Sequence, residues 1–334
     1  MLKNILTAIV VSSVYTHSFA TDLFPEGNLR EIKAGDFVQP TDTAGGYPIF
    51  QNDGNWKFLN GKAYTSSGAA DSVKMGTVQL DYYASGYLLA RQNISVNTGG
   101  GGNSSWSGSP CSPGHLVIRD KGRGKQDNCM TIDAQSVTAG TTSTTFLNIV
   151  LTNSGSAGRY YRIILGINAD LLGVRGTGTG DWTEEELKSK PYKKEAIDRL
   201  TAWAEPIQDG SIRAFDFSKP QDVYTKIPSF MTLLPVPEDL VGQKRSISFV
   251  SAVEHLRHLN TIKSIAYSRY EDYKGAWGFV TEQPTQEVAD KAAVARCESI
   301  RTTNRPDAPV CAVYRLTDGK RVSDTYDFKP ASPK

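Results

Sequence analysis

Alternating apolar and polar positions over residues 47–173 predict a domain of antiparallel strands. In one segment Val78, Leu80 and Tyr82 are apolar at every second position, as in a strand with one buried face. About eight short segments of this kind follow one another without a helical period between them, separated by turn signals such as Asn-Asp-Gly at 52–54. This spacing is typical of a β-sandwich or a barrel-like domain.

The period becomes helical after Gly180. Thr183 is the predicted N-cap of a first helix, and Glu186 three residues later completes a capping box. Pro191 suits the first position of a second helix. The apolar face of that second helix consists of Tyr192, Ala196, Leu200, Trp203 and Ala204.

Residues 206–242 are rich in proline and have no apolar period, so we expect a long irregular connection there. The segment FVSAVEHLRHL at 249–259 predicts one more helix, with Phe249, Val253 and Leu256 on its apolar side.

The C-terminal segments predict a separate small unit with the order β-β-α-β. Strands are expected in SIAYS at 264–268, GAWGFV at 275–280 and CAVYRL at 311–316. An alanine-rich helix is expected before the third strand, with Thr285 as its N-cap.

The chain is therefore expected to be an α+β protein. We predict a signal peptide at 1–20, an extended arm at 21–46 and an antiparallel β domain, sandwich or barrel-like, at 47–173. A helical and irregular connector at 174–262 then leads to a small disulfide-bonded α/β domain at 263–334.

The N-terminus has the three parts of a secretory signal peptide. Lys3 is the positive part, residues 5–14 are apolar, and Ser-Phe-Ala at 18–20 matches a cleavage site. We expect cleavage between Ala20 and Thr21 and a periplasmic or secreted mature chain. The apolar run is shorter than the roughly 20 residues of a spanning helix. No later segment is long and apolar enough, so we expect no membrane span in the mature chain.

Four cysteines in an exported chain indicate disulfides. Three pairings are possible, and proximity along the chain favours Cys111–Cys129 and Cys297–Cys311. Loops of that size are expected to contribute about 3 kcal/mol each. Neither pair has the tight C-x-x-C spacing of a zinc site.

The C-terminal unit carries a pattern of its own: Tyr-Ser at 267–268, the strand GAWGFV, Ala-x-x-x-Ala before Cys297, and Cys311 opening a strand. Over residues 263–322 this pattern resembles a small exported bacterial domain of unknown function, with a longer turn at 268–274 and a longer loop at 300–309. The preceding β region resembles uncharacterised exported proteins of Gram-negative bacteria. The resemblance implies export and supports the domain division, and it implies no catalytic residue.

The charge balance argues against a dedicated nucleic-acid binder. Removal of the signal peptide takes away Lys3 alone among the charged side chains, so Lys+Arg falls from 37 to 36 against 35 Asp+Glu. A nucleic-acid-binding domain is markedly basic. We therefore expect no nucleic-acid partner.

The glycine-rich stretch at 173–182 has the outline of a phosphate-binding loop. Thr179 and Gly180 stand where a P-loop has Lys and Ser or Thr. Glu184, Glu185 and Glu186 follow and would repel a phosphate. We therefore expect no nucleotide and no cofactor, and we interpret the stretch as a joint between the β domain and the helices.

Catalytic patterns are scarce. His255 and His258 lack the H-E-x-x-H spacing and a third ligand, so we expect no metal site. There is no G-x-S-x-G motif for a serine nucleophile. A catalytic pair of carboxylates for glycoside cleavage stays an open alternative, because the fold and not the spacing in the sequence sets the distance between two carboxylates. The acidic residues concerned are Glu205, Asp209, Asp216, Glu254 and Asp272.

The first candidate ligand site is the loop IRDKGRGKQDNC. Four cations alternate along it, and a braced cationic loop suits an anionic ligand such as the phosphates of lipopolysaccharide. The alternative is a solvated hairpin tip, with Asp120 and Asp127 partly cancelling its charge. The four cations are Arg119, Lys121, Arg123 and Lys125.

The second candidate is the aromatic turn before Trp277. Tyr270 and Tyr273 are expected to be exposed there, and exposed aromatic side chains are enriched at interaction surfaces. The alternative is that these rings belong to the core of the small domain. Alternation along the strand is expected to bury Trp277.

These observations favour an exported, non-enzymatic protein that binds an envelope or extracellular ligand. The alternative is a secreted hydrolase that acts on cell-wall or polysaccharide material through carboxylates that the sequence does not identify. A third hypothesis is a structural or inhibitory partner protein, which would expose a large apolar patch.

Overall fold

The computed structural model describes most of the chain after residue 20. The predicted signal peptide at 1–20, Lys125, His258 and the 269–274 segment with Tyr270, Asp272 and Tyr273 lie outside the described residues. The described residues are 21–52, 56–66, 73–84, 87–100, 110–123, 126–139, 142–156, 158–174, 178–216, 226–234, 247–257, 259, 261–268 and 275–314.

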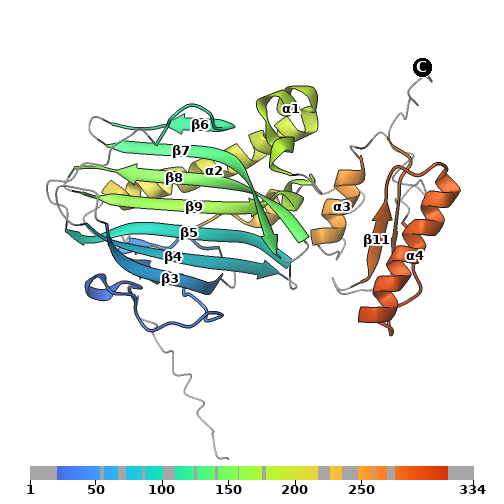
Figure 1. The fold of residues 1–334 in the computed structure, drawn as a ribbon, viewed down its shortest axis with the longest axis horizontal. Coiled ribbons are helices and arrows are strands. Elements are labelled where there is room, and N and C mark those ends of the chain that lie inside the picture. Colours follow the sequence, from blue (N-terminus) through green and yellow to red (C-terminus); the bar gives the residue numbers. More distant parts are fainter. Residues whose placement is uncertain are drawn as a thin grey trace, which may run out of the picture.

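One seven-stranded antiparallel sheet dominates the N-terminal part (Figure 1). Its strand order is β3-β4-β5-β9-β8-β7-β6. Two meanders that are separate in sequence therefore meet where β5 pairs with β9. The strands are β3 (Trp56–Ser66), β4 (Val73–Ala84), β5 (Tyr87–Gly100), β6 (Val117–Asp120), β7 (Asp127–Ala139), β8 (Thr142–Ser154) and β9 (Tyr160–Asn168).

One face of this sheet is buried. Ile94, Ile163, Leu151 and Met130 lie opposite one another on four neighbouring strands, and each is at most 1 % exposed. Successive side chains of a strand point to opposite faces, so the residues between these point to the other face of the sheet. We call this other face the outer face.

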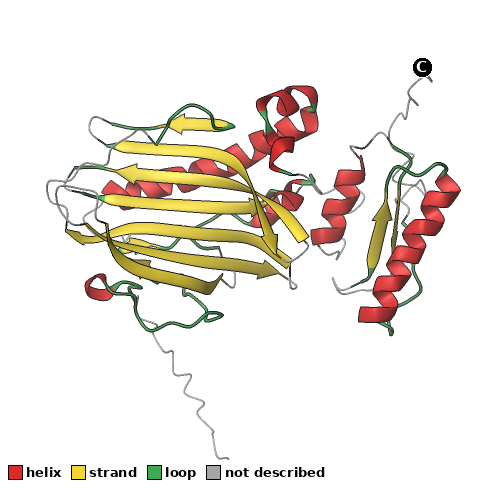
Figure 2. Cartoon of the chain, viewed as in Figure 1, coloured by secondary structure: helices red, strands yellow, loops and turns green. Residues whose placement is uncertain are grey.

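The layer against the buried face is a helix together with the N-terminal arm. Helix α2 (Pro191–Asp216) lies behind the strands in Figure 2 and buries Ala196, Leu200 and Phe215 in the same core. The Tyr47 ring, directly after the arm, stacks on Tyr161 of β9 at 4.7 Å. The predicted α+β class is confirmed, and the N-terminal domain is sandwich-like, with α2 and the arm opposite the sheet.

Helix α2 is longer than the sequence predicts. An irregular connection was expected from residue 206, but α2 continues through Pro206 to Asp216, so the prediction is wrong for this segment. A proline inside a helix costs about 3 kcal/mol. Burial of Ile207, Ala214 and Phe215 against the sheet offsets that cost, since each buried large apolar side chain is worth about 1.5–3 kcal/mol.

Of the capping box predicted before α2, the Thr183 cap forms. The Thr183 hydroxyl accepts a hydrogen bond from the Glu186 N–H at 3.2 Å and caps α1 (Glu184–Ser189). The Glu186 carboxylate accepts from the ammonium groups of Lys190 at 2.6 Å and Lys193 at 2.9 Å. The short elements beside it are η2 (Ala169–Leu172) and η3 (Thr179–Trp182).

The N-terminal arm packs closely on the large sheet. It contains the turn η1 (Pro25–Gly27) and the strand β1 (Thr43–Ala44), which pairs with β2 (Tyr47–Pro48) directly after the arm. Phe24 is 2 % exposed, and its ring lies directly over Gly76 of β4. The arm is thus part of the core.

A second sheet with the order β11-β10-β12 forms the C-terminal unit. Its face with Ile265 packs on α3, and its face with Ala266 packs on α4. Helix α3 therefore shares a core with β10, although the predicted boundary at 262/263 separates them. The elements are α3 (Ile247–Arg257), β10 (Ser264–Tyr267), β11 (Trp277–Val280), α4 (Gln286–Asn304) and β12 (Ala312–Val313).

Helix α3 also contacts the large domain. The Ser251 hydroxyl donates a hydrogen bond to the Asp170 carbonyl of η2. A further 3-10 turn, η5 (Phe230–Thr232), places Phe230 against Trp203 of α2 at 5.7 Å. Among the described residues, no helix is both long and apolar enough to cross a membrane.

Replacement of Gly76 by alanine tests the contact between arm and sheet. A Cβ at this position would lie 2.8 Å from carbon atoms of the Phe24 ring, and overpacking of a core costs about 1–3 kcal/mol. We expect Gly76→Ala to lower the thermal unfolding midpoint measured by circular dichroism, and the loss to shrink in a Phe24→Leu background. Gly180→Ala is the control, because a Cβ there meets nothing within 4 Å. An unchanged midpoint for Gly76→Ala would show that the ring does not rest on β4.

Candidate functional site

The predicted basic loop is docked on α2. Lys121 Nζ lies 2.7 Å from Asp209 Oδ1, and Arg119 Nε lies 4.0 Å from Glu205 Oε1. Between these two pairs, the Gln208 side-chain amide of α2 donates to the Arg119 carbonyl at 3.1 Å. Two of the predicted ligand-binding cations therefore face carboxylates of the same molecule.

The disulfide of this loop is as predicted. Cys111 and Cys129 are bonded, with their Cα atoms 5.6 Å apart. Arg123 forms a bridge to Gln126 through its backbone, and Lys125 lies outside the described residues. That the loop binds an anion stays a prediction. The carboxylates of α2 partly offset the charges of Arg119 and Lys121.

The histidines and the α3 carboxylate of the described residues lie beside other side chains of the protein. His115 Nδ1 lies 2.5 Å from Asp133 Oδ2, and the His255 ring packs edge-on against Phe279 at 6.3 Å. Glu254 lies 3.4 Å from Arg257 within α3. Among the described residues, no group of three or more His, Cys, Asp or Glu side chains could hold a metal ion.

The aromatic strand β11 runs beside α4. Trp277 and Phe279 point to the same face of the strand, and their rings stack at 6.2 Å with an interplanar angle of 14°. Gly278 between them points toward α4. A Cβ on Gly278 would lie 2.9 Å from the Cys297 nitrogen, so only glycine permits this close approach of helix and strand.

A pocket of about 300 Å³ opens between β11 and α4. Arg296 and Ile300 line it from α4, one helical turn apart. The Arg296 guanidinium donates to the Phe279 carbonyl at 3.3 Å and lies 5.8 Å from the Phe279 ring centroid. The strand contributes Gly275, Ala276, Trp277, Gly278 and Phe279.

Arg296 carries an uncompensated charge at this pocket. The ion pairs within α4, in the part of the chain that the structure describes, join Lys291 to Glu287 and Arg301 to Glu298. None of them includes Arg296. A guanidinium held by a carbonyl and a ring keeps further N–H donors for an anion.

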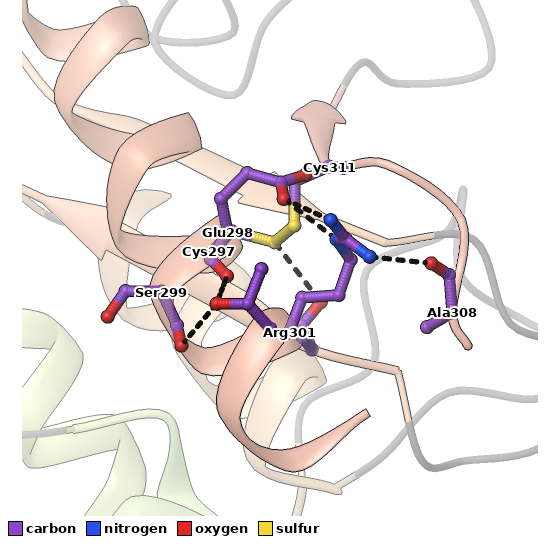
Figure 3. Close-up of a disulfide and its surroundings, with 8 residues drawn as sticks. Cys297, Glu298, Ser299, Arg301, Ala308 and Cys311 are labelled. Atoms are coloured by element: carbon purple, nitrogen blue, oxygen red, sulfur yellow. Dashed lines mark hydrogen bonds and ion pairs between the residues drawn. A yellow bond between two sulfur atoms is a disulfide. The ribbon is translucent and has the colours of Figure 1, made fainter. Parts of the chain in front are cut away.

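The second disulfide holds the end of α4 in place (Figure 3). Cys297 of α4 is bonded to Cys311, which precedes β12, as the sequence predicts. The Glu298 carboxylate accepts from the Cys311 N–H at 2.5 Å and from Arg301 Nε at 2.7 Å. Arg301 also donates to the Ala308 carbonyl at 3.1 Å. These bonds fix the helix turn that carries Arg296 and Ile300.

The structure brings together residues that the sequence analysis did not select. Tyr270 and Tyr273, the predicted ligand residues of this region, lie outside the described residues. Trp277 was expected to be buried, but it is half-buried and lines the pocket. Arg296 has no sequence signal, because only the packing of α4 on Gly278 places it beside Phe279.

No family model, no curated protein and no solved structure matches this chain. The resemblance of residues 263–322 to an exported bacterial domain therefore stays a prediction.

Neutralisation of Glu298 is expected to destabilise the protein in a pH-dependent way. The Cys311 N–H, followed by the Arg301 guanidinium, lowers the pKa of Glu298 below its ordinary value. A carboxylate with a lowered pKa stabilises the folded state above its unfolded pKa, and this stabilisation is lost as the pH falls through the folded pKa. In urea unfolding, the wild type should exceed Glu298→Gln in stability at neutral pH, and the two should converge in acid.

Glu287→Gln is the matched control for this experiment, because Glu287 sits on the same helix in an exposed pair with Lys291. Such exposed pairs contribute about 0–1 kcal/mol. A stability difference for Glu298→Gln that persists unchanged into acid would contradict the assigned hydrogen bonds.

Proposed function

We propose that this is an exported, non-enzymatic binding protein whose C-terminal unit binds a small anionic ligand with an apolar or aromatic body. The pocket between β11 and α4 is its binding site. The sequence of residues 1–20 has the pattern of a cleaved signal peptide ending at Ala20, and two disulfides suit an oxidising compartment outside the cytoplasm.

The observation that carries this proposal is the position of Arg296. Arg296 lines the pocket, and its guanidinium lies 5.8 Å from the Phe279 ring centroid, without a carboxylate partner among the described residues. Hydrogen bonds between a guanidinium and a carboxylate, sulfonate or phosphate are among the strong ones in proteins. The anionic group of the ligand therefore binds to Arg296.

The rest of the lining favours an apolar body. Ile300 and Ala276 present apolar side chains, and Gly275 and Gly278 add no side chain. The rings of Trp277 and Phe279 pack on the α3 side of the strand. A volume of about 300 Å³ lies at the small end of ligand pockets. These properties fit a small aromatic or acyl body that bears a negative group.

Fluorescence titration with 8-anilinonaphthalene-1-sulfonate tests this site, because the dye joins aromatic rings to a sulfonate. Arg296→Gln should weaken its saturable binding about tenfold or more, as expected for the loss of a hydrogen bond to a charged group. Arg296→Lys should keep part of the affinity, because the positive charge remains.

Lys291→Gln is the matched control, since it removes one positive charge from the same helix at a side chain that is 76 % exposed. N-phenyl-1-naphthylamine, which lacks the sulfonate, should bind wild type and Arg296→Gln alike. Equal binding of the sulfonate dye to wild type and Arg296→Gln would refute the site.

A further inference from the structure

The outer face of the large sheet carries a second feature, which is independent of the C-terminal pocket. The strand register places one residue from each of five strands in a straight line across this face. Neighbouring strands are about 4.8 Å apart, so the line spans roughly 19 Å. We name it the 62–162 row, and it consists of Lys62, Thr77, Ser95, Arg162 and Thr152.

The row is cationic and rich in hydroxyl groups. Lys62 of β3 and Arg162 of β9 are separated by Thr77 and Ser95, and Thr152 follows on β8. Hydroxyl side chains both donate and accept hydrogen bonds. The row therefore places two hydroxyl groups between two groups that attract anions, and Thr152 at its end is only 8 % exposed.

Arg162 has an unsatisfied donor. Its Nε is buried and makes no hydrogen bond, although buried polar atoms are nearly always paired. Burial raises the pKa of Tyr160, and the hydrogen-bonded guanidinium of Arg162 partly offsets this rise. In the described part of β3, β4, β5 and β9, Asp81 forms an ion pair with Arg91. Lys62 and Arg162 have no carboxylate partner there.

The charges of the outer face are segregated. Outer positions of β3, β4, β5 and β9 carry four cations against one acid among the described residues, whereas β6 and β7 carry Asp120, Asp127 and Asp133. Asp81, the one acid of the cationic half, is 2 % exposed and bonded to both ends of the Arg91 guanidinium. The four cations are Lys57, Lys62, Arg91 and Arg162.

Two tyrosines provide apolar surface on the same half. Tyr64 of β3 is 42 % exposed, with the Lys62 ammonium 5.1 Å from its ring centroid. Tyr83 of β4 is 40 % exposed and donates to Asp81 at 3.3 Å. An exposed tyrosine offers a ring face together with a polar end. In Figure 1 no described helix lies in front of these strands, and α2 lies behind them.

We propose that the cationic half of the outer face binds an extended anionic polysaccharide along the 62–162 row. The acidic groups of the glycan pair with Lys62 and Arg162, its hydroxyls bond to Thr77 and Ser95, and its sugar rings contact Tyr64. A flat line of hydroxyls between two cations complements a chain that alternates hydroxyl and acidic substituents. Nucleic acid suits this row less well, because proteins that bind nucleic acid are markedly basic and the whole chain has a net charge of only +2.

Dextran sulfate and dextran are the probes, because they share one chain and differ in sulfate. The mature protein should bind dextran sulfate with an affinity that falls with salt, and should bind dextran far more weakly. Lys62→Gln combined with Arg162→Gln should weaken dextran sulfate binding roughly tenfold or more, and Arg162→Lys should retain most of it.

The matched control is Lys188→Gln combined with Lys291→Gln, which removes the same charge from exposed helix positions. It should leave dextran sulfate binding unchanged, and all variants should keep the thermal midpoint of the wild type. If both double variants lose the same affinity for dextran sulfate, binding depends on net charge alone and the 62–162 row is not the binding site. Equally tight binding of dextran, or of single-stranded poly(dT) at the same salt, would overturn the ligand class.

Discussion

The ladder between β5 and β9 is the constraint on which the large domain depends. It pairs residues 90–96 with residues 161–167, so it joins the β3–β5 meander to the β6–β9 meander. The buried face becomes continuous only through this pairing, because Ile94 and Ile163 lie opposite each other at its centre. Unpaired, the two meanders would each expose an edge strand, which natural sheets avoid.

The same alternation that buries one face determines what the other face offers. Leu151 and Ile163 point to α2, so Thr152 and Arg162 point outward at the same register. On α2, Glu205 lies near Arg119 of β6 and Asp209 pairs with Lys121, which follows that strand. Carboxylates of the same molecule thus partly neutralise the cations of the basic loop. Lys62 and Arg162 have no carboxylate partner in the described part of the chain.

In the C-terminal unit, two short-range constraints make the pocket. Gly278 permits α4 to lie against β11, and the Cys297–Cys311 disulfide with the Glu298 bonds fixes the same turn of that helix. Arg296 precedes the disulfide cysteine directly, so its backbone is held at the point where its side chain meets Phe279. Rigid support of this kind is what a binding side chain needs.

The sequence alone determined the α+β class, the strands of the large domain, the Thr183 and Thr285 caps and both disulfides, because these follow from local periodicity, capping chemistry and loop length. It misjudged α2 beyond Pro206, since a local helix breaker is outweighed by burial that only the sheet provides. The tertiary structure alone decided which cations are paired and which are not. Arg119 and Glu205 are distant in sequence, as are Arg296 and Phe279, and Lys62 and Arg162. Strand register and helix docking bring such residues together, and neither is encoded in the spacing along the chain.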